Sequence, residues 1–176
     1  LRLIVQEGYD IKLTADIDLN NILWNGVGTG NSSTGFAGSF DGNGHVIYNV
    51  NIDGTNARRG FFNSTSAGSE IKNLVIYGSI ESSSNYVAVL SAINYAYISN
   101  CYVFGNVVTT GQYAGLLTSW DANAIYEDCV TYGLIEAKDS IGGIAGYHSK
   151  DTSGIGNITN CINYASIIAT GLSNTS

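Results

Sequence analysis

Several acidic residues stand in pairs or motifs that could hold a metal ion or transfer a proton. Residues 41–44 read Asp-Gly-Asn-Gly and resemble the start of a calcium-binding loop, but the twelfth position of that pattern holds isoleucine instead of glutamate. Asp16 and Asp18 alternate along a predicted strand and point the same way, which would suit a hard cation or a solvated face. Glu127 and Asp128 are neighbours, so in a strand they point to opposite faces and are poorly placed as an acid and base pair. We therefore predict turns and solvated positions here, and no metal site.

The other side chains with catalytic potential lack the partners that catalysis requires. His45 and His148 each stand apart from any serine or cysteine in a recognisable nucleophile motif. Arg58 and Arg59 form a cationic pair near Asp53, which is typical of a solvated loop. The sequence has no phosphate-binding glycine loop and no HExxH motif. We predict no catalytic residue and no cofactor.

Aromatic residues recur at one position of a repeated pattern. Each follows a Leu or Cys position by three residues, and the set is Tyr77, Phe104, Tyr132 and Tyr164, with Tyr102 beside it. Pointing outward, these rings would form a surface that binds a sugar or a peptide; pointing inward, they would belong to the core. The alternation of Cys101 and Val103 favours the outward orientation, whereas the polar Thr131 and Asn163, which replace Val103 in later repeats, argue against it. Both interpretations, a binding face and core packing, stay open.

The pattern behind this column is a repeat that covers most of the chain. Segments related to Ile-x-Asn-Cys occur at 47–50, 71–74, 98–101, 126–129 and 158–161, and their last positions are 24, 27, 28 and 32 residues apart. Four residues after each last position come Gly54, Gly78, Gly105, Gly133 and Ala165. A period in this range indicates a solenoid, in which each repeat contacts mainly its neighbours.

Short strands account for these repeats better than helices do. Each apolar run is short, is rich in Val, Ile and Tyr, and is separated from the next run by Gly, Asn and Ser. Three such strands per repeat predict one coil of a single-stranded parallel β-helix, an all-β solenoid whose coils lie about 4.8 Å apart. The absence of proline agrees with this, because interior coils need their strand N–H groups for hydrogen bonds.

Stacked coils would place equivalent residues of the repeat in ladders. One predicted ladder consists of Cys101, Cys129 and Cys161, which we expect to be free, buried and unreactive, because parallel Cβ vectors do not favour a disulfide. The other ladder is polar, and its amides would hydrogen-bond along the axis and satisfy buried backbone groups of the turns. Its members are Asn49, Asn73, Asn100, Asp128 and Asn160.

The chain is predicted to form one continuous domain with two parts. Residues 1–46 are interpreted as irregular opening coils, with a protruding loop at 28–35, and residues 47–176 as regular coils. The last repeat would reach its third strand only at Thr175, so we expect the solenoid to end open, as a fragment of a longer chain would. Open coil ends expose unpaired strand edges, which favours self-association.

The composition argues against some classes of partner. The 176 residues include seven Lys and Arg and fourteen Asp and Glu, which gives a net charge of −7 and a pI near 4.5. This argues against binding to nucleic acid or to an anionic membrane, since both need a clustered cationic surface. No apolar run approaches the roughly 18 residues of a spanning helix, so we expect no membrane insertion.

In the order of its motifs the chain resembles bacterial GLUG-motif repeat proteins. The matching segments are 13–19, the Trp-Asn-Gly-Val-Gly of 24–28, 40–47, and the Ile-x-Asn-Cys segments that precede Gly-Leu-Leu-Thr or Gly-Gly-Ile-Ala-Gly. Such repeats occur in secreted or surface-anchored proteins, including adhesin-like proteins and non-catalytic regions of immunoglobulin A-cleaving metallopeptidases. The resemblance implies a right-handed, pectate-lyase-like β-helix and an extracellular location. It brings no catalytic residue to this chain.

Together these observations predict a non-enzymatic, extracellular β-solenoid module of a bacterial surface protein. It would act as an adhesin, stalk or assembly unit through its lateral surface and open coil ends, with a host glycan or a protein as ligand. One alternative is a carbohydrate-active β-helix enzyme, a lyase or hydrolase, in which carboxylates converge with each other or with Arg58 or Arg59. Another alternative is an accessory domain that positions substrate for a large surface peptidase.

Overall fold

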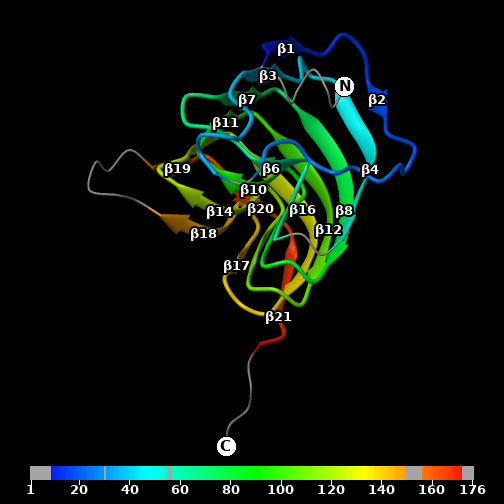
Figure 1. Cartoon of the computed structure of the whole chain (residues 1–176), viewed down its shortest axis with the longest axis vertical. Helices are drawn as coiled ribbons and strands as arrows, with labels where there is room; N and C mark the ends of the chain where they lie inside the picture. The colour runs from blue at the N-terminus through cyan, green and yellow to red at the C-terminus, as the bar shows by residue number, and fades with distance from the viewer. Residues whose placement is uncertain (1–8, 30, 55–56, 150–155, 172–176) are drawn as a thin grey trace, which may run out of the picture.

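The strands of successive repeats pair in parallel and stack along one axis (Figure 1). The computed structural model describes residues 9–29, 31–54, 57–149 and 156–171, and these contain strands and turns but no helix. Strands that are equivalent in the repeat hydrogen-bond to one another, so four parallel sheets run through the stack of coils. The predicted all-β parallel solenoid is confirmed.

Each complete coil passes through the four sheets in the same order. Sheet 1 contains β1 (Ile11–Lys12), β3 (Ser39–Asp41), β7 (Glu70–Lys72), β11 (Tyr97–Ser99), β15 (Ile125–Glu127) and β19 (Asn157–Thr159). Sheet 2 contains β2 (Ile17–Asp18), β4 (Val46–Gly54), β8 (Val75–Ser82), β12 (Tyr102–Thr109), β16 (Val130–Ala137), β20 (Ile162–Asn163) and β21 (Ser166–Ala169). Sheet 3 contains β5 (Arg58–Arg59), β9 (Tyr86–Ala88), β13 (Tyr113–Gly115) and β17 (Ile141–Gly142). Sheet 4 contains β6 (Phe62–Ser64), β10 (Ser91–Asn94), β14 (Thr118–Ala122) and β18 (Ala145–Ser149).

The third predicted strand of each coil is divided in two by a pair of residues at a corner. In one coil β13 and β14 flank Leu116 and Leu117, and both leucines are fully buried. Buried apolar side chains thus fill the corner between sheets 3 and 4. The three-strand prediction fits the coil, with its third side shared between these two short sheets.

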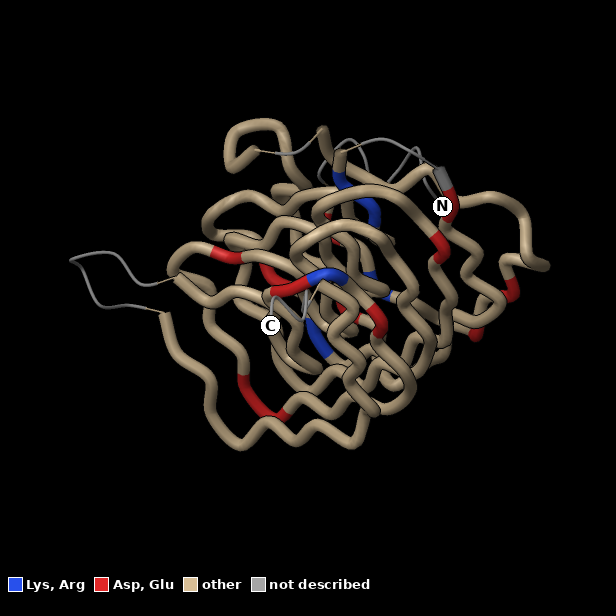
Figure 2. The backbone as a smooth tube through the Cα atoms, turned by 90° about the horizontal axis from the view of Figure 1, so that it is seen from below, with Lys and Arg blue, Asp and Glu red and all other residues tan. Residues whose placement is uncertain are grey.

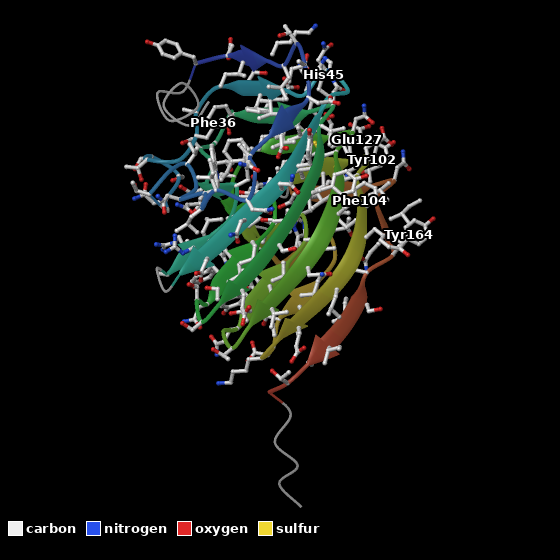
Figure 3. The ribbon with its side chains drawn as sticks, turned by 90° about the vertical axis from the view of Figure 1, so that its right-hand side faces the viewer. Phe36, His45, Tyr102, Phe104, Glu127 and Tyr164 are labelled. Carbon is white, nitrogen blue, oxygen red and sulfur yellow. The ribbon has the colours of Figure 1, made fainter. Side chains whose placement is uncertain are left out.

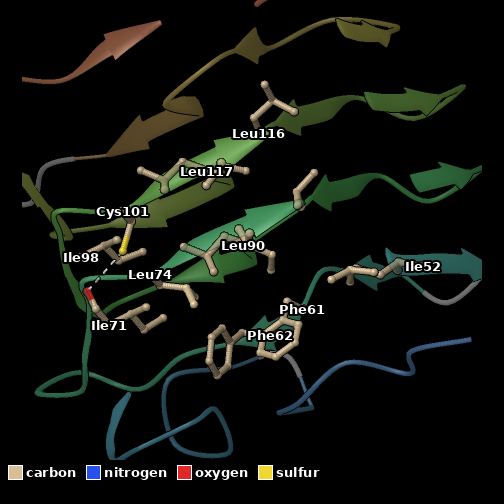
Figure 4. Packing of buried hydrophobic residues seen from close by; sticks show 14 of the residues in the cluster. Ile52, Phe61, Phe62, Ile71, Leu74, Leu90, Ile98, Cys101, Leu116 and Leu117 are labelled. Atoms are coloured by element: carbon tan, nitrogen blue, oxygen red, sulfur yellow. Dashed lines mark hydrogen bonds between the residues drawn. The ribbon is translucent and has the colours of Figure 1, made fainter. Parts of the chain in front are cut away.

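Alternation along the long strands of sheet 2 builds much of the core. In β12 the side chains of Val103 and Val107 are fully buried, whereas Tyr102 and Asn106 are exposed. Because neighbouring strands are in register, buried side chains stack coil upon coil. Figure 4 shows part of this core, including Phe61, Phe62, Leu90, Leu116 and Leu117.

Cysteine occupies one position of this stack. Cys101 and Cys129 are fully buried, and the Cys101 thiol donates to the backbone carbonyl of Ile71 over 3.8 Å (Figure 4). Hydrogen bonding to the Cys101 side chain, together with burial, raises the pKa of Cys129 to about 12. Contact with Cys129 also raises the pKa of Cys161, but this side chain is only half-buried, since no further described coil covers it. The prediction of three buried thiols is therefore wrong at Cys161.

Thiol labelling should distinguish Cys161 from the other two cysteines. A thiol reagent must reach the sulfur atom, so a fully buried thiol reacts slowly even where a half-buried one reacts. We expect mass spectrometry to find Cys161 modified first in the native protein, and Cys101 and Cys129 modified at comparable rates only after denaturation. Equal labelling of all three cysteines under native conditions would contradict the described burial.

A column of glycines in sheet 2 allows the coils to approach one another closely. Gly78, Gly105 and Gly133 are in register on β8, β12 and β16. A Cβ atom at Gly105 would lie 1.8 Å from the carbonyl oxygen of Gly78, and one at Gly133 would lie 1.7 Å from the carbonyl oxygen of Gly105. Only glycine fits such a close approach of backbone to backbone.

The pairing is irregular at both places where another residue takes the glycine position. Val50 stands opposite Gly78, and a bulge shifts the register of β4 just before it. Ala165 takes the position in the last described coil, and there the strand is interrupted between β20 and β21. The prediction that Gly54 belongs to this column is wrong, because the bulge places Gly54 opposite Ser82.

The opening coils are built from short strands and isolated bridges. Val27 and Phe36 each form one parallel bridge, to Phe62 and Thr65 respectively, and the chain between them leaves the sheets as a loop. Within this loop the Asn31 side-chain oxygen accepts hydrogen bonds from the backbone of residues 33 and 34. The division at residue 46 stays a prediction. Residues 1–8, 30, 55–56, 150–155 and 172–176, which include Thr175, lie outside the described residues.

Candidate ligand-binding face

The predicted aromatic column lies on the outer face of sheet 2, which we call the aromatic face. Tyr77, Phe104 and Tyr132 are in register on β8, β12 and β16, and Tyr164 continues the column after β20. Tyr77, Tyr132 and Tyr164 are 44%, 57% and 62% exposed. Tyr102, which is also exposed, stands two residues before Phe104 on the same face of β12, and Figure 3 shows Tyr102, Phe104 and Tyr164 on this side of the molecule. Core packing of these rings, one of the two interpretations that the sequence left open, is therefore wrong.

Strand alternation explains the outward orientation of the rings. A hydrogen bond explains why the polar Thr131 can lie on the inner face, which had argued against this orientation. Val103 is fully buried on the opposite face of β12, and Thr131 is fully buried at the equivalent position of β16. The Thr131 hydroxyl donates to the side-chain oxygen of Asn163 over 2.8 Å. The buried Thr131 can thus occupy the inner face, because Asn163 accepts its hydrogen bond.

The rings differ in how much of their faces they leave free. Tyr77 and Phe104 stack with centroids 4.6 Å apart and an interplanar angle of 10°, so they cover part of each other. Tyr132 is tilted by 42° from Phe104 at 6.3 Å, and Tyr164 by 45° from Tyr132 at 6.4 Å. Tyr132 and Tyr164 therefore present the largest free ring surfaces of the aromatic face.

Amide side chains border the other end of this face. A pocket of about 270 Å³ adjoins Tyr77 and Phe104, and its lining includes Asn21, Asn49 and Asn51. The rings supply flat apolar contact, and the neighbouring amides donate and accept hydrogen bonds. Binding sites for small ligands typically combine apolar surface with a few polar groups in this way. This arrangement suits a ligand with both C–H and hydroxyl groups.

The predicted polar ladder follows the turn between sheets 1 and 2. Its members Asn73, Asn100, Asp128 and Asn160 have left-handed φ values of 53°, 48°, 53° and 52°. The Asn100 amide donates to the side-chain oxygen of Asn73 over 2.8 Å, and the Asn73 amide donates to Asp41 over 3.0 Å. Asn and Asp are the non-glycine residues that tolerate this backbone conformation best, so the turn selects them.

Asn49 does not belong to this ladder. It lies in the bulge of β4, and its amide donates to Asp18 over 2.8 Å instead of to a ladder member. The position equivalent to Asn73 is taken by Gly42, whose amide bonds to the carbonyl of Lys72. Residues inserted after Gly42 displaced the sequence alignment of this repeat. The ladder was also predicted to satisfy buried backbone groups. This is wrong at Asn100, because its side chain is exposed.

Replacing Asp128 with Asn should stabilise the protein. A carboxylate cannot donate to the Asn100 side chain above it, whereas an amide at this position would extend the chain of hydrogen bonds. We expect Asp128→Asn to raise the free energy of unfolding by about 0.5–1 kcal/mol, the net value of one exposed hydrogen bond. Urea unfolding would measure this, and a lower stability of Asp128→Asn would contradict the ladder.

The carboxylates singled out by the sequence make structural hydrogen bonds. Asp16 accepts from the backbone of Val46 and contacts His45 at 3.1 Å, which keeps the pKa of Asp16 below its usual value. The Asn73 amide lowers the pKa of Asp41 in the same way, and the Tyr97 hydroxyl donates to Glu127. No three His, Cys, Asp or Glu side chains converge as a metal site within the described ranges.

Arg58 and Arg59 differ from the prediction of a solvated loop. They form β5 at the edge of sheet 3, where Arg58 pairs with Tyr86 and Arg59 pairs with the buried Val87. Arg59 is only 6% exposed, and the Nε atoms of both arginines are buried without a hydrogen-bond partner. In the view of Figure 2, the few basic segments lie among acidic and uncharged ones.

A buried polar network inside sheet 4 was not predicted. Asn94, Asp121 and His148 are in register on β10, β14 and β18, and the Tyr126 hydroxyl lies between the first two. This hydroxyl accepts from the Asn94 amide over 3.1 Å and donates to Asp121 over 2.9 Å. His148 contacts Asp121 at 2.8 Å, and burial raises the pKa of Asp121. The spacing of 27 residues between the three strand positions was the available signal, but nothing in the sequence marks Asp121 as buried.

Comparison with known proteins adds one partial similarity. Halomucin from Haloquadratum walsbyi (strain DSM 16790 / HBSQ001) is 35% identical to this chain over an alignment of 103 residues, which covers 56% of the chain and 1% of halomucin. The chain thus spans about 1% of the length of this relative. No protein-family model and no solved structure matches the chain. Across the described ranges, no helix is long and apolar enough to cross a membrane.

Proposed function

We propose that this chain is a non-enzymatic β-solenoid module of an extracellular surface protein, and that it binds a glycan with the aromatic face of sheet 2. The observation that carries the proposal is the row of outward rings in register on successive coils. In this role the module acts as an adhesin or stalk segment whose lateral surface makes the contacts. The similarity to halomucin and the resemblance to GLUG repeats support a surface protein.

The aromatic face favours a glycan over other ligands. Tyr132 and Tyr164 offer ring faces to the C–H groups of a sugar, and the asparagines at the other end of the face offer donors and acceptors to its hydroxyl groups. The rings stand on paired strands of a solenoid, so their spacing is set by the backbone and needs little ordering on binding. A chain-like ligand lying along the axis would contact several coils.

A non-enzymatic role is supported by what the acidic side chains do. Asp16, Asp41 and Glu127 are each engaged by donors of neighbouring coils, and Asp121 is enclosed by its network. Groups held in this way serve the fold and would be poor acids or bases for a sugar on the aromatic face.

Truncating a tilted ring should weaken glycan binding. We expect Tyr132→Ala to lower affinity at least about tenfold for a glycan identified on an array, since the loss of an aromatic anchor costs about 1.4 kcal/mol or more. Titration calorimetry would measure this. Tyr9→Ala, at an exposed ring away from sheet 2, is the control and should bind like the unmodified protein. A glycan bound equally well by Tyr132→Ala, or no glycan bound at all, would overturn the proposal.

A further inference from the structure

A second set of aromatic residues lies where sheets 3 and 4 meet. On sheet 3, Arg58 and Tyr86 are in register, and Tyr86 stacks on Tyr113 with centroids 4.9 Å apart at an angle of 6°. On sheet 4, Trp120 and Tyr147 are in register and nearly parallel, with centroids 6.3 Å apart. We call these two stacks of side chains, one on sheet 3 and one on sheet 4, the two aromatic ladders. They stand on different sheets from the aromatic face, so they form a separate surface.

The corner between these sheets is re-entrant, which brings the two ladders together. Gly115 lies on the same side of β13 as Tyr113, and a Cβ atom at Gly115 would fall 1.9 Å from the carbonyl oxygen of Thr118. The chain therefore folds back on the outer side of the coil here. As a result Tyr113 reaches Tyr147 edge to face at 6.0 Å, and the rings of the two sheets form adjoining walls.

A small cavity opens between these walls. Its lining consists of Arg58, Tyr86, Ile93, Tyr95 and Trp120, and its volume is about 130 Å³. This volume is below the roughly 150 Å³ of an enclosed cavity that holds benzene, and the cavity is open to solvent, so it can contact one side of a six-membered ring without enclosing it. Tyr95 meets Trp120 edge to face at 6.0 Å, which fixes the orientation of the indole. The walls are thus flat, aromatic and ordered by their own contacts.

A cation with unused donors stands at this cavity. The Arg58 guanidinium lies over the Tyr86 ring, 5.7 Å from its centroid, and its Nε atom is buried without a hydrogen-bond partner. Among the described residues no carboxylate forms an ion pair with Arg58. Because Nε is buried, the two terminal nitrogens of the guanidinium are the donors that can bind a carboxylate through two parallel hydrogen bonds.

We propose that this cavity binds a pyranose ring that carries a carboxylate, as in a uronic acid residue of an oligosaccharide. The Trp120 indole contacts the apolar face of the sugar, and Arg58 pairs with its acid group. The net charge of −7 disfavours anionic ligands on the chain as a whole, and Arg58 supplies a local positive charge that such a ligand needs. This site goes beyond the proposed glycan binding by the aromatic face and does not depend on it.

Titration calorimetry with two matched sugars tests this site. The probes are a linear trimer of galacturonic acid and the neutral trimer of galactose. We expect the acidic trimer to bind at least tenfold more tightly to the unmodified protein, and Arg58→Gln to remove that difference. Tyr9→Ala should leave both affinities unchanged, and Tyr132→Ala, which impairs the aromatic face, should keep the preference for the acidic trimer, which separates this site from the aromatic face. Equal affinity for the two trimers, no binding of the acidic one, or unchanged binding by Arg58→Gln would overturn the proposal.

Nuclear magnetic resonance of the unmodified protein gives a second test that needs no stable variant. The indole N–H of Trp120 should shift on addition of the acidic trimer, whereas that of the buried Trp24 should not. Trp120→Leu removes one wall of the cavity and keeps Arg58. It should lower the affinity for the acidic trimer at least tenfold. Binding of the acidic trimer with no change at the Trp120 indole would contradict the placement of the ligand.

Discussion

Gly105→Ala is expected to lower the free energy of unfolding by about 3 kcal/mol or more, because it forces an atom into a space that backbone already occupies. The added Cβ would lie 1.8 Å from the carbonyl oxygen of Gly78 and 3.3 Å from a methyl group of Val89. Relief requires β12 to move away from β8, which breaks hydrogen bonds between two coils. Urea unfolding followed by circular dichroism would measure the loss.

Gly44→Ala is the matched control for this prediction. Gly44 has a φ of +79°, and a Cβ atom there meets nothing within 4 Å, so only backbone strain of about 1–2 kcal/mol is expected. Both variants add one methyl group, and they differ in whether the neighbouring coil leaves room for it. If Gly105→Ala cost no more than Gly44→Ala, the close approach of the coils would be contradicted.

Tyr126→Phe is expected to destabilise the protein by about 2–4 kcal/mol, although it removes only one oxygen atom. The hydroxyl accepts from Asn94 and donates to Asp121, and all three residues are fully buried. Its loss leaves an amide and a carboxylate each without that partner, and an unsatisfied buried polar group costs about 1–3 kcal/mol. Chemical unfolding would measure the change.

Tyr132→Phe provides the control, because it removes the same atom from an exposed ring. Surface changes of this kind stay within about 0.5 kcal/mol of the unmodified protein. Equal stability of Tyr126→Phe and Tyr132→Phe would show that the hydroxyl of Tyr126 is not part of a buried network.

The periodic part of the fold could be predicted from the sequence, because each coil places the same types of residue at the same positions. Apolar residues at alternate positions, asparagine or aspartate at a left-handed turn, and glycine at the point of closest approach recur at nearly constant spacing. The first repeat misled the alignment, since residues inserted after Gly42 and the bulge in β4 shift Asn49 and Gly54 away from their expected partners. Insertions and bulges change the register without changing the residue pattern.

The orientation of the aromatic column could not be decided from the sequence for a physical reason. Thr131 and Asn163 occupy inner positions that usually hold apolar residues; Thr131 is buried with its hydroxyl bonded to Asn163, and Asn163 is exposed and also bonds to the backbone of Ala165. The second aromatic set was missed because it joins strands of different sheets. Arg58 and Trp120 are far apart in the repeat pattern, and the re-entrant corner that brings them to one cavity depends on how the coil closes.

Both proposed sites have a closely packed glycine next to an aromatic residue or near one. Gly78, Gly105 and Gly133 each follow a ring of the aromatic face directly, and Gly115 closes the corner beside Tyr113. In both places a residue without a side chain lets the backbone come close, and the neighbouring aromatic residue projects outward. Binding surfaces of this kind are built by the repeat itself, so their rings are spaced by the distance between coils.

The central claim is that successive coils are stacked in register, and spin labels on one face test it most directly. Ser79 and Asn106 are exposed partners on β8 and β12, so cysteines at both positions would lie one coil apart, about 4.8 Å between strands. With Cys161 replaced by alanine, electron paramagnetic resonance of the doubly labelled protein should show strong dipolar broadening that is absent from each singly labelled protein. A doubly labelled spectrum equal to the sum of the two single spectra would contradict the stacking of these coils.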